Sequence, residues 1–328
     1  MKKIIGYSFL GFLCLSLIFG FISIRNINTN FFKERPAYLQ LSHQSKPMNF
    51  KWTNNNIEGH IENQSSMLLP VKIGTLEHNL HVQFDTGAPN SYIYEKDLIS
   101  LRKLGCYIKE IKKNGARFVE NLEMELGGQQ ISLSMIMIYP NYGTNFSTEF
   151  NANSTYIIGT IGSDILVDRI TSIDFENQEL QFFEKRPTWM DEINSFKPFD
   201  FPGRRIMLPV TIDGKTYEFL YDSGCSAFGL ITTKQRFNKY TDNTAPIVTY
   251  DAKSWEDKIH INSKPSDHKF TIADQELPLK RVSYVDMYSM LQPIATVLTR
   301  IGGWMGNQSL NESQLILDTQ TNQFTVIP

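Results

Sequence analysis

The amino-acid sequence contains one set of short motifs twice, and this duplication constrains the fold more than any other feature. Residues 69–73 read LPVKI, and residues 208–212 read LPVTI. Each is followed by a turn and an apolar segment that ends in an acidic turn. The acidic turns are Asp85-Thr86-Gly87 in the first copy and Asp222-Ser223-Gly224 in the second.

The order of the motifs is also kept further along the chain. Each copy contains an apolar segment that ends in a glycine, Gly162 or Gly306, with an aspartate at the same spacing beyond it. Those aspartates, Asp174 and Asp318, are expected to mark turns between paired strands. The sequence therefore predicts one kind of lobe built twice, from residues 67–188 and 197–328, with 189–196 as the connection.

Short apolar runs separated by Gly, Asn and Asp turns are typical of an all-β domain. A hydrophobic fraction of 41% is enough for one large or two medium cores. We therefore predict an all-β fold of two β-barrel-like lobes related by a pseudo-twofold axis. Three cysteines are too few for a disulfide framework, and the scattered histidines do not suggest a zinc site.

The balance of charge makes nucleic acid a poor candidate for a partner. There are 32 Lys and Arg against 34 Asp and Glu, a formal net charge of −2. Such a chain has no long-range field that would gather a polyanion.

The first 25 residues resemble a membrane or export signal. Residues 4–24 carry no charge and lie between Lys2-Lys3 and Arg25. As a helix they would reach about 30 Å, the hydrocarbon thickness of a bilayer. We predict an uncleaved signal anchor at 1–25, with a cleaved signal peptide as the alternative. Either places the rest of the chain outside the cytoplasm, anchored in the membrane or secreted.

Residues 26–66 have few periodic apolar positions and many polar ones, so they are predicted to form a stalk. A propeptide that is later removed is the alternative.

The two acidic turns are the candidate chemical centre. An aspartate after a buried strand, followed by a hydroxyl residue and a glycine, presents one carboxylate on a tight turn. A pseudo-twofold axis would bring Asp85 and Asp222 together. Two carboxylates at about 3 Å cannot both ionise, so one would act as base and the other as acid.

These paired motifs resemble those of the pepsin-like and retropepsin-like aspartic proteases over residues 67–328. The resemblance implies that Asp85 and Asp222 form a dyad that activates a water against a peptide bond, without a metal or organic cofactor. It also implies supporting roles for Thr86, Gly87, Ser223, Gly224, Gly162 and Gly306. Thr86 and Ser223 would make hydrogen bonds across the dyad, and Gly162 and Gly306 would let the backbone pass close to each turn.

The chain departs from that family pattern in three places. Ala88 and Cys225 stand where pepsin-like members carry a hydroxyl, so each carboxylate is expected to lose a donor and the dyad to titrate higher. The candidate flap is a hairpin with Asn114-Gly115 at its tip. That tip has no tyrosine, and Phe118 is the nearest aromatic residue. A structural role is expected for Asp164, and packing is expected for Cys225.

The sequence thus favours a monomeric, membrane-anchored aspartic endopeptidase acting on polypeptides outside the cytoplasm. Two alternatives stay open. One is a catalytically silent protein of the same fold that binds a protein or glycan, and the other is a structural envelope protein.

Overall fold

The computed structural model describes residues 35–41, 46–57, 60–146, 149, 151, 153–254, 257–285 and 301–328. The predicted membrane helix at 4–24 lies outside these residues. Within them, no helix has the length and apolar character that a bilayer crossing needs.

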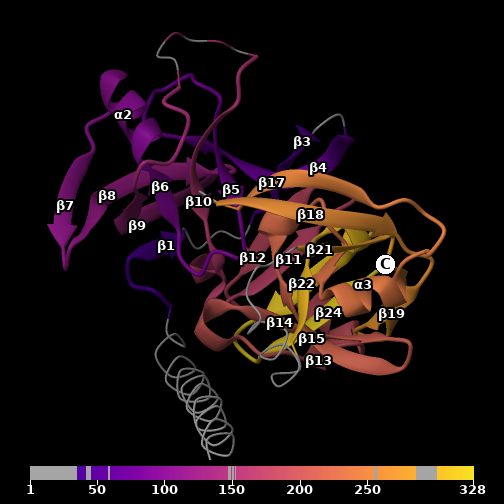
Figure 1. Cartoon of the computed structure of the whole chain (residues 1–328). Coiled ribbons are helices and arrows are strands. Elements are labelled where there is room, and N and C mark those ends of the chain that lie inside the picture. The colour runs from indigo at the N-terminus through magenta and orange to yellow at the C-terminus, as the bar shows by residue number, and fades with distance from the viewer. Residues whose placement is uncertain are drawn as a thin grey trace, which may run out of the picture.

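Most described elements are strands, which confirms the all-β prediction, and they form three sheets. The first contains β1 (Leu39–Leu41), β3 (Lys51–Ile57), β4 (His60–Lys72), β5 (Leu80–Phe84), β6 (Tyr92–Tyr94), β7 (Lys109–Lys113), β8 (Ala116–Leu126), β9 (Gln129–Tyr139) and β10 (Tyr156–Ile161). The third contains β14 (Ile206–Ile212), β15 (Lys215–Tyr221), β16 (Leu230–Thr232), β17 (Val248–Ser254), β18 (Asp257–Pro265), β19 (Lys269–Ile272), β20 (Gln275–Pro278), β21 (Arg281–Val285) and β22 (Ile301–Met305). Figure 1 shows the first sheet, in indigo to magenta, beside the third, in orange to yellow.

The first and third sheets repeat the same pairings. β5 runs parallel to β10, which is antiparallel to β6, and β6 is parallel to β9. In the second copy β15 runs parallel to β22, β22 is antiparallel to β16, and β16 is parallel to β21. The internal repeat of the sequence is therefore also a repeat of strand topology.

The remaining sheet joins the two halves. Its strands are β2 (Met48–Asn49), β11 (Ile170–Asp174), β12 (Glu179–Phe183), β13 (Lys197–Pro198), β23 (Gln314–Asp318) and β24 (Gln323–Ile327). β11 of the first half pairs antiparallel with β23 of the second. The expectation that Asp174 and Asp318 mark turns is confirmed, because each accepts a hydrogen bond from a backbone N–H just beyond its strand, that of Asn177 or Gln320, at 2.9 Å.

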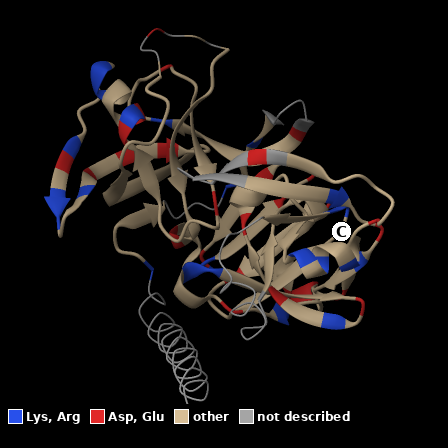
Figure 2. Ribbon diagram, in the orientation of Figure 1, with Lys and Arg blue, Asp and Glu red and all other residues tan. Residues whose placement is uncertain are grey.

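In the described part of the chain two α-helices lie on the outside of the lobes, α2 (Glu95–Lys103) and α3 (Lys234–Tyr240). Inward-facing strand residues such as Leu69, Phe84, Leu208 and Phe219 are fully buried. Figure 2 shows Lys and Arg interspersed with Asp and Glu over both lobes.

The prediction of a stalk at 26–66 does not hold for the described residues between 35 and 66, whereas a propeptide stays a prediction. Strands β1, β2 and β3 pair with β9, β12 and β4, respectively. Leu39 and Met48 are fully buried, and the Arg35 guanidinium lies 2.7 Å from the Glu184 carboxylate. This stretch contributes to the core of the folded body, so removing it would expose that core.

The same segment reaches the second lobe. Glu62, which is buried, forms an ion pair with Arg281 at the start of β21. Gln64 accepts a hydrogen bond from the Asn311 side chain. The first lobe therefore begins well before residue 67.

Candidate active site

The two acidic turns follow equivalent strands and are anchored in the same way. β5 ends at Phe84, and the Asp85 N–H donates to the Ile161 carbonyl of β10 at 3.0 Å. β15 ends at Tyr221, and the Asp222 N–H donates to the Met305 carbonyl of β22 at 2.9 Å. Each turn therefore leaves its sheet at the point where a parallel neighbour ends.

Four hydrogen bonds tie the turns to each other. The Thr86 N–H donates to Ser223 Oγ, and the Ser223 N–H donates to Thr86 Oγ1, both at 2.9 Å. The hydroxyls then donate in opposite directions, Thr86 Oγ1 to the Tyr221 carbonyl at 3.2 Å and Ser223 Oγ to the Phe84 carbonyl at 2.9 Å. Both side chains are fully buried, so water cannot replace these bonds.

The glycines in the turns leave room for the opposite carboxylate. A Cβ atom on Gly87 would lie 2.5 Å from the carboxylate of Asp222. A Cβ atom on Gly224 would lie 2.5 Å from Oδ1 of Asp85. Each carboxylate therefore lies against the backbone of the other turn, which no side chain at these positions would permit.

Gly162 and Gly306 lie behind the turns, where the backbone passes close to them. A Cβ on Gly162 would lie 2.5 Å from the Ala88 carbonyl oxygen, and one on Gly306 would lie 2.0 Å from that of Cys225. The structure thus brings together the dyad and supporting residues that the resemblance singled out.

The carboxyl groups of Asp85 and Asp222 lie close together, each against the glycine of the opposite turn. Burial raises the pKa of Asp85 well above its usual range, and the charge of Asp222 and the hydrogen bond to it raise it further. The backbone N–H groups of Gly87 and Ala88, at 3.0 and 3.3 Å from Oδ1, act in the opposite direction. Asp85 therefore keeps a proton where an isolated aspartate would be ionised.

Ala88 follows the first acidic turn and Cys225 follows the second. The expectation that both carboxylates lose a side-chain donor is wrong for the second turn. Cys225 does not leave Asp222 without a side-chain donor, because its Sγ lies 3.3 Å from Asp222 Oδ2 and donates to it. Burial, followed by the Asp222 charge, raises the pKa of the Cys225 thiol well above its usual range. The residue is therefore a protonated donor. Ala88 has no such group, so the prediction of a lost side-chain donor applies to Asp85 alone.

The candidate flap hairpin forms, with its tip in solvent. Asn114 and Gly115 adopt φ values of 52° and 81°, as a tight hairpin turn requires. Both are exposed, and Phe118 pairs across the hairpin with Ile111. Figure 1 shows β7 at the outer edge of the first lobe, on the side away from β17 and β18.

A group of tyrosines that sequence reasoning missed lies near Asp85. The rings of Tyr94 and Tyr142 have centroids 4.6 Å apart, and those of Tyr139 and Tyr142 are 5.4 Å apart. Burial raises the pKa of Tyr142, and Tyr139 and the charge of Asp85 raise it further. These side chains meet because β6 and β9 are paired, which their separation in sequence does not reveal.

The loop that carries Tyr142 is held by a buried acid of α2. Asp97 Oδ1 accepts hydrogen bonds from the Thr144 hydroxyl at 2.9 Å and from its N–H at 3.2 Å. Gly143, which separates Tyr142 from Thr144 in sequence, has a φ of 103°, and a Cβ atom on it would lie 2.0 Å from Asp97 Oδ2. Tyr142 is therefore presented by a fixed loop.

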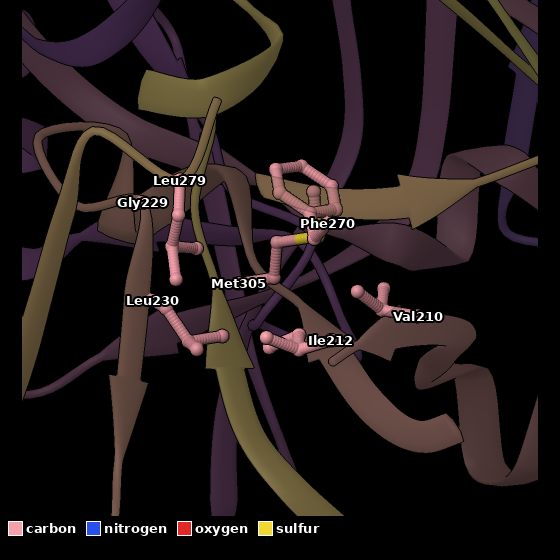
Figure 3. A pocket seen from close by; sticks show the side chains of 7 residues that line it. All are labelled: Val210, Ile212, Gly229, Leu230, Phe270, Leu279 and Met305. Carbon is pink, nitrogen blue, oxygen red and sulfur yellow. The ribbon is translucent and has the colours of Figure 1, made fainter. Parts of the chain in front are cut away.

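A small cavity lies inside the second lobe, and its lining has no group that could take part in acid–base chemistry. Figure 3 shows its lining, which consists of Val210, Ile212, Gly229, Leu230, Phe270, Leu279 and Met305. All seven are apolar, so the space is a packing gap in the core. The described part of the chain holds no group of three or more His, Cys, Asp and Glu side chains placed to bind a metal.

Comparison with known proteins gave a structural match only. No family model matches the sequence, and no curated protein matches it. Among solved structures, the crystal structure of an aspartic proteinase from Irpex lacteus matches with a TM-score of 0.44 and 11% identity. The match covers 87% of this chain and 97% of that one. A likeness at this level says nothing about activity.

Proposed function

We propose that this protein is an aspartic endopeptidase that hydrolyses peptide bonds with a water activated between Asp85 and Asp222. The observation that supports this most is the placement of each carboxyl group against the opposite turn, with the two turns joined by Thr86 and Ser223. A pair that holds one proton contains a base and an acid at the same place, as the hydrolysis of an amide requires.

The surroundings of Asp85 and Asp222 suggest which carboxyl group acts as the acid and which acts as the base. Asp85 is only 9% exposed and keeps its proton, so it starts as the acid. Asp222 accepts hydrogen bonds from the Gly224 N–H at 2.8 Å and from the Cys225 thiol. With the proton on Asp85, Asp222 is the group left to act as the base.

The reaction then balances without another group. Asp222 takes a proton from the water as the water oxygen bonds to the peptide carbonyl carbon, while Asp85 gives its proton to the carbonyl oxygen. Collapse of the tetrahedral intermediate returns that proton to Asp85 and breaks the C–N bond. Asp222 gives its proton to the leaving nitrogen, so the pair ends with one proton on Asp85.

The raised pKa of Asp85 sets an expectation for the pH dependence. Activity requires one proton on the pair, and Asp85 retains it to a higher pH than an isolated aspartate would. The optimum is therefore expected nearer neutrality than that of gastric-type enzymes, and a sharp optimum below about pH 4 would contradict this assignment.

The test uses the full chain with a diverse peptide pool, scanned across pH, beside Asp85→Asn and Asp222→Asn. Asp274→Asn is the matched control, because its side chain is mostly exposed and pairs with Lys197. Cleavage by the parent and the control, but by neither dyad variant, would support the proposal. If the folded parent does not cleave across the pH range, the proposal fails and a binding protein of this architecture becomes the better reading.

The location and partners follow as further proposals. We propose that residues 4–24 anchor the protein in a membrane, that the body lies outside the cytoplasm and that its partner is a polypeptide substrate met by a monomer. Retention of the full chain in membranes after alkaline extraction would support the anchor. Release of a form that lacks the first residues would instead favour the cleaved signal.

A further inference from the structure

The turn that carries Asp85 is held from behind by a buried acid. Ser91, at the end of this turn, donates from its N–H and its hydroxyl to the two carboxylate oxygens of Asp164, at 2.8 and 2.7 Å. The Ser91 hydroxyl also accepts from the Gly162 N–H at 3.1 Å. Asp164 is fully buried, so these contacts take the place of the hydrogen bonds that water would make with its carboxyl group.

A tyrosine bridges this acid to an arginine. The Tyr38 hydroxyl donates to Asp164 Oδ2 at 2.7 Å and accepts from Arg204 Nη1 at 3.1 Å. Arg204 Nη1 also donates to Asn90 Oδ1 at 2.7 Å and to the Pro89 carbonyl at 3.3 Å. The guanidinium therefore binds the same turn that Asp164 holds, four to six residues after Asp85.

Arg204 does not belong to the first lobe. It lies just before β14, the first strand of the second lobe, and is only 7% exposed. Gly203 and Arg204 have φ values of 57° and 64°, a conformation that an arginine rarely adopts unless its surroundings impose it. The Ser163 hydroxyl also donates to the Arg204 carbonyl at 2.5 Å. This backbone conformation directs the Arg204 guanidinium of the second lobe toward Asn90 and Pro89 of the first lobe.

The other acidic turn has a neutral counterpart. Gln308 occupies the position that corresponds to Asp164. Beside it, Asn307 accepts from the Tyr221 hydroxyl at 2.6 Å and donates to Ser226 Oγ at 2.8 Å. The duplication therefore places a buried carboxyl group behind Asp85, where the Asp222 turn has the amide side chain of Asn307.

We propose that Arg204 and Asp164 are positioning residues that fix the Asp85 turn relative to the second lobe and so set how its carboxyl meets that of Asp222. This inference rests on the proposed function. Arg204 and Asp164 are both buried and are joined through the Tyr38 hydroxyl behind this one turn, an arrangement best explained by orientation. Loss of the Arg204 side chain removes its hydrogen bonds to Tyr38, Asn90 and Pro89, and the turn is then free to shift away from the dyad geometry.

The experiment compares Arg204→Met, Arg204→Lys and Tyr38→Phe in the full chain. Lys197→Met is the matched control, because Lys197 lies in β13 shortly before Arg204 and its ion pair with Asp274, at 2.6 Å, is partly exposed. Two quantities are measured: kcat and KM for a cleaved peptide, and the titration of the aspartates by carboxyl 13C NMR. Asp85→Asn and Asp222→Asn identify the dyad signals.

Arg204→Met is expected to lower kcat by roughly tenfold to hundredfold with KM changed less than about twofold, since a small displacement of a reacting group is enough for such a loss. Its dyad signals should lose the coupled, two-step titration of the parent. Tyr38→Phe should lower kcat and weaken the coupled titration to a smaller extent. Arg204→Lys should keep part of the kcat that Arg204→Met loses, and Lys197→Met should match the parent in both quantities.

Folded Arg204→Met and Tyr38→Phe variants with the parent's kcat and titration would overturn the inference. If Arg204→Met does not fold, Tyr38→Phe decides alone. The NMR titration separates the two proposals, because a parent that cleaves nothing contradicts the proposed function, whereas the coupled titration and its loss can still be observed.

Discussion

Replacing Thr86 with valine tests whether the hydrogen bonds between the turns hold the two lobes in register. Valine has nearly the same shape, so the change leaves no cavity but removes the hydroxyl. The Ser223 N–H then loses its acceptor at 2.9 Å, and the Tyr221 carbonyl loses a donor at 3.2 Å. Both groups are buried beneath the dyad. At about 1–3 kcal/mol for each of these two groups, the free energy of unfolding should fall by about 2–6 kcal/mol.

Urea unfolding of the parent and of Thr86→Val measures this loss. Thr211→Val is the matched control, because its hydroxyl lies 2.7 Å from that of Thr216 at an exposed site and its removal should cost less than about 0.5 kcal/mol. Ser223→Ala breaks the reciprocal bond, so the double variant should lose less than the sum of the single losses. A Thr86→Val loss no larger than that of the control would refute the reasoning.

Three other perturbations probe the site and its surroundings. Cys225→Ala should move the acidic limb of the pH–activity profile upward by roughly half to one unit and Cys225→Ser should move it downward, because a donor at Asp222 Oδ2 favours the carboxylate; equal profiles would contradict this. Gly87→Ala should lower kcat by more than about a hundredfold in an otherwise folded protein, because its Cβ would lie 2.5 Å from the Asp222 carboxylate; steady-state cleavage measures this, and near-normal turnover would refute it. Burial lowers the pKa of His81, so the unfolded chain binds a proton more readily below about pH 6.5 and stability should fall as the pH drops from there. Urea midpoints at pH 7.5 and 5.5 should show a smaller fall in His81→Gln, and equal falls would exclude this residue as the cause.

Local patterns in the sequence were enough to predict the all-β class and the acidic turns. A turn such as Asp85-Thr86-Gly87 depends on its own residues, and its repetition at Asp222 supplied the partner. The polar run before residue 67 misled because edge strands keep polar residues on their outer side. In β3, for example, Lys51 and Asn54 are exposed, whereas the adjacent Phe50 is buried.

Other features depend on contacts that no local pattern encodes. Arg204 lies in a connection without periodicity, and its role appears only when it meets Asn90 of the first lobe. Tyr142 lies near Asp85 only because a loop is fixed by Asp97 in a different element. The sequence Asn114-Gly115 predicted the turn of the candidate flap hairpin. The direction in which the hairpin points depends on the pairing of its strands in the sheet, which the local sequence does not encode.

The duplicated halves present their two acids symmetrically but surround them differently. The bonds between Thr86 and Ser223 treat both turns alike, so they hold the carboxyls together without deciding which one keeps the proton. Which acid keeps the proton depends on their unequal surroundings. Burial is the main cause of the raised pKa of Asp85, and Cys225 donates to Asp222 where Ala88 leaves Asp85 with backbone donors only. A base and an acid are in different protonation states. Two copies of one turn can therefore supply both roles only where the residues around the two aspartates differ. The residues expected to set the direction of proton transfer are therefore those at which the two copies differ.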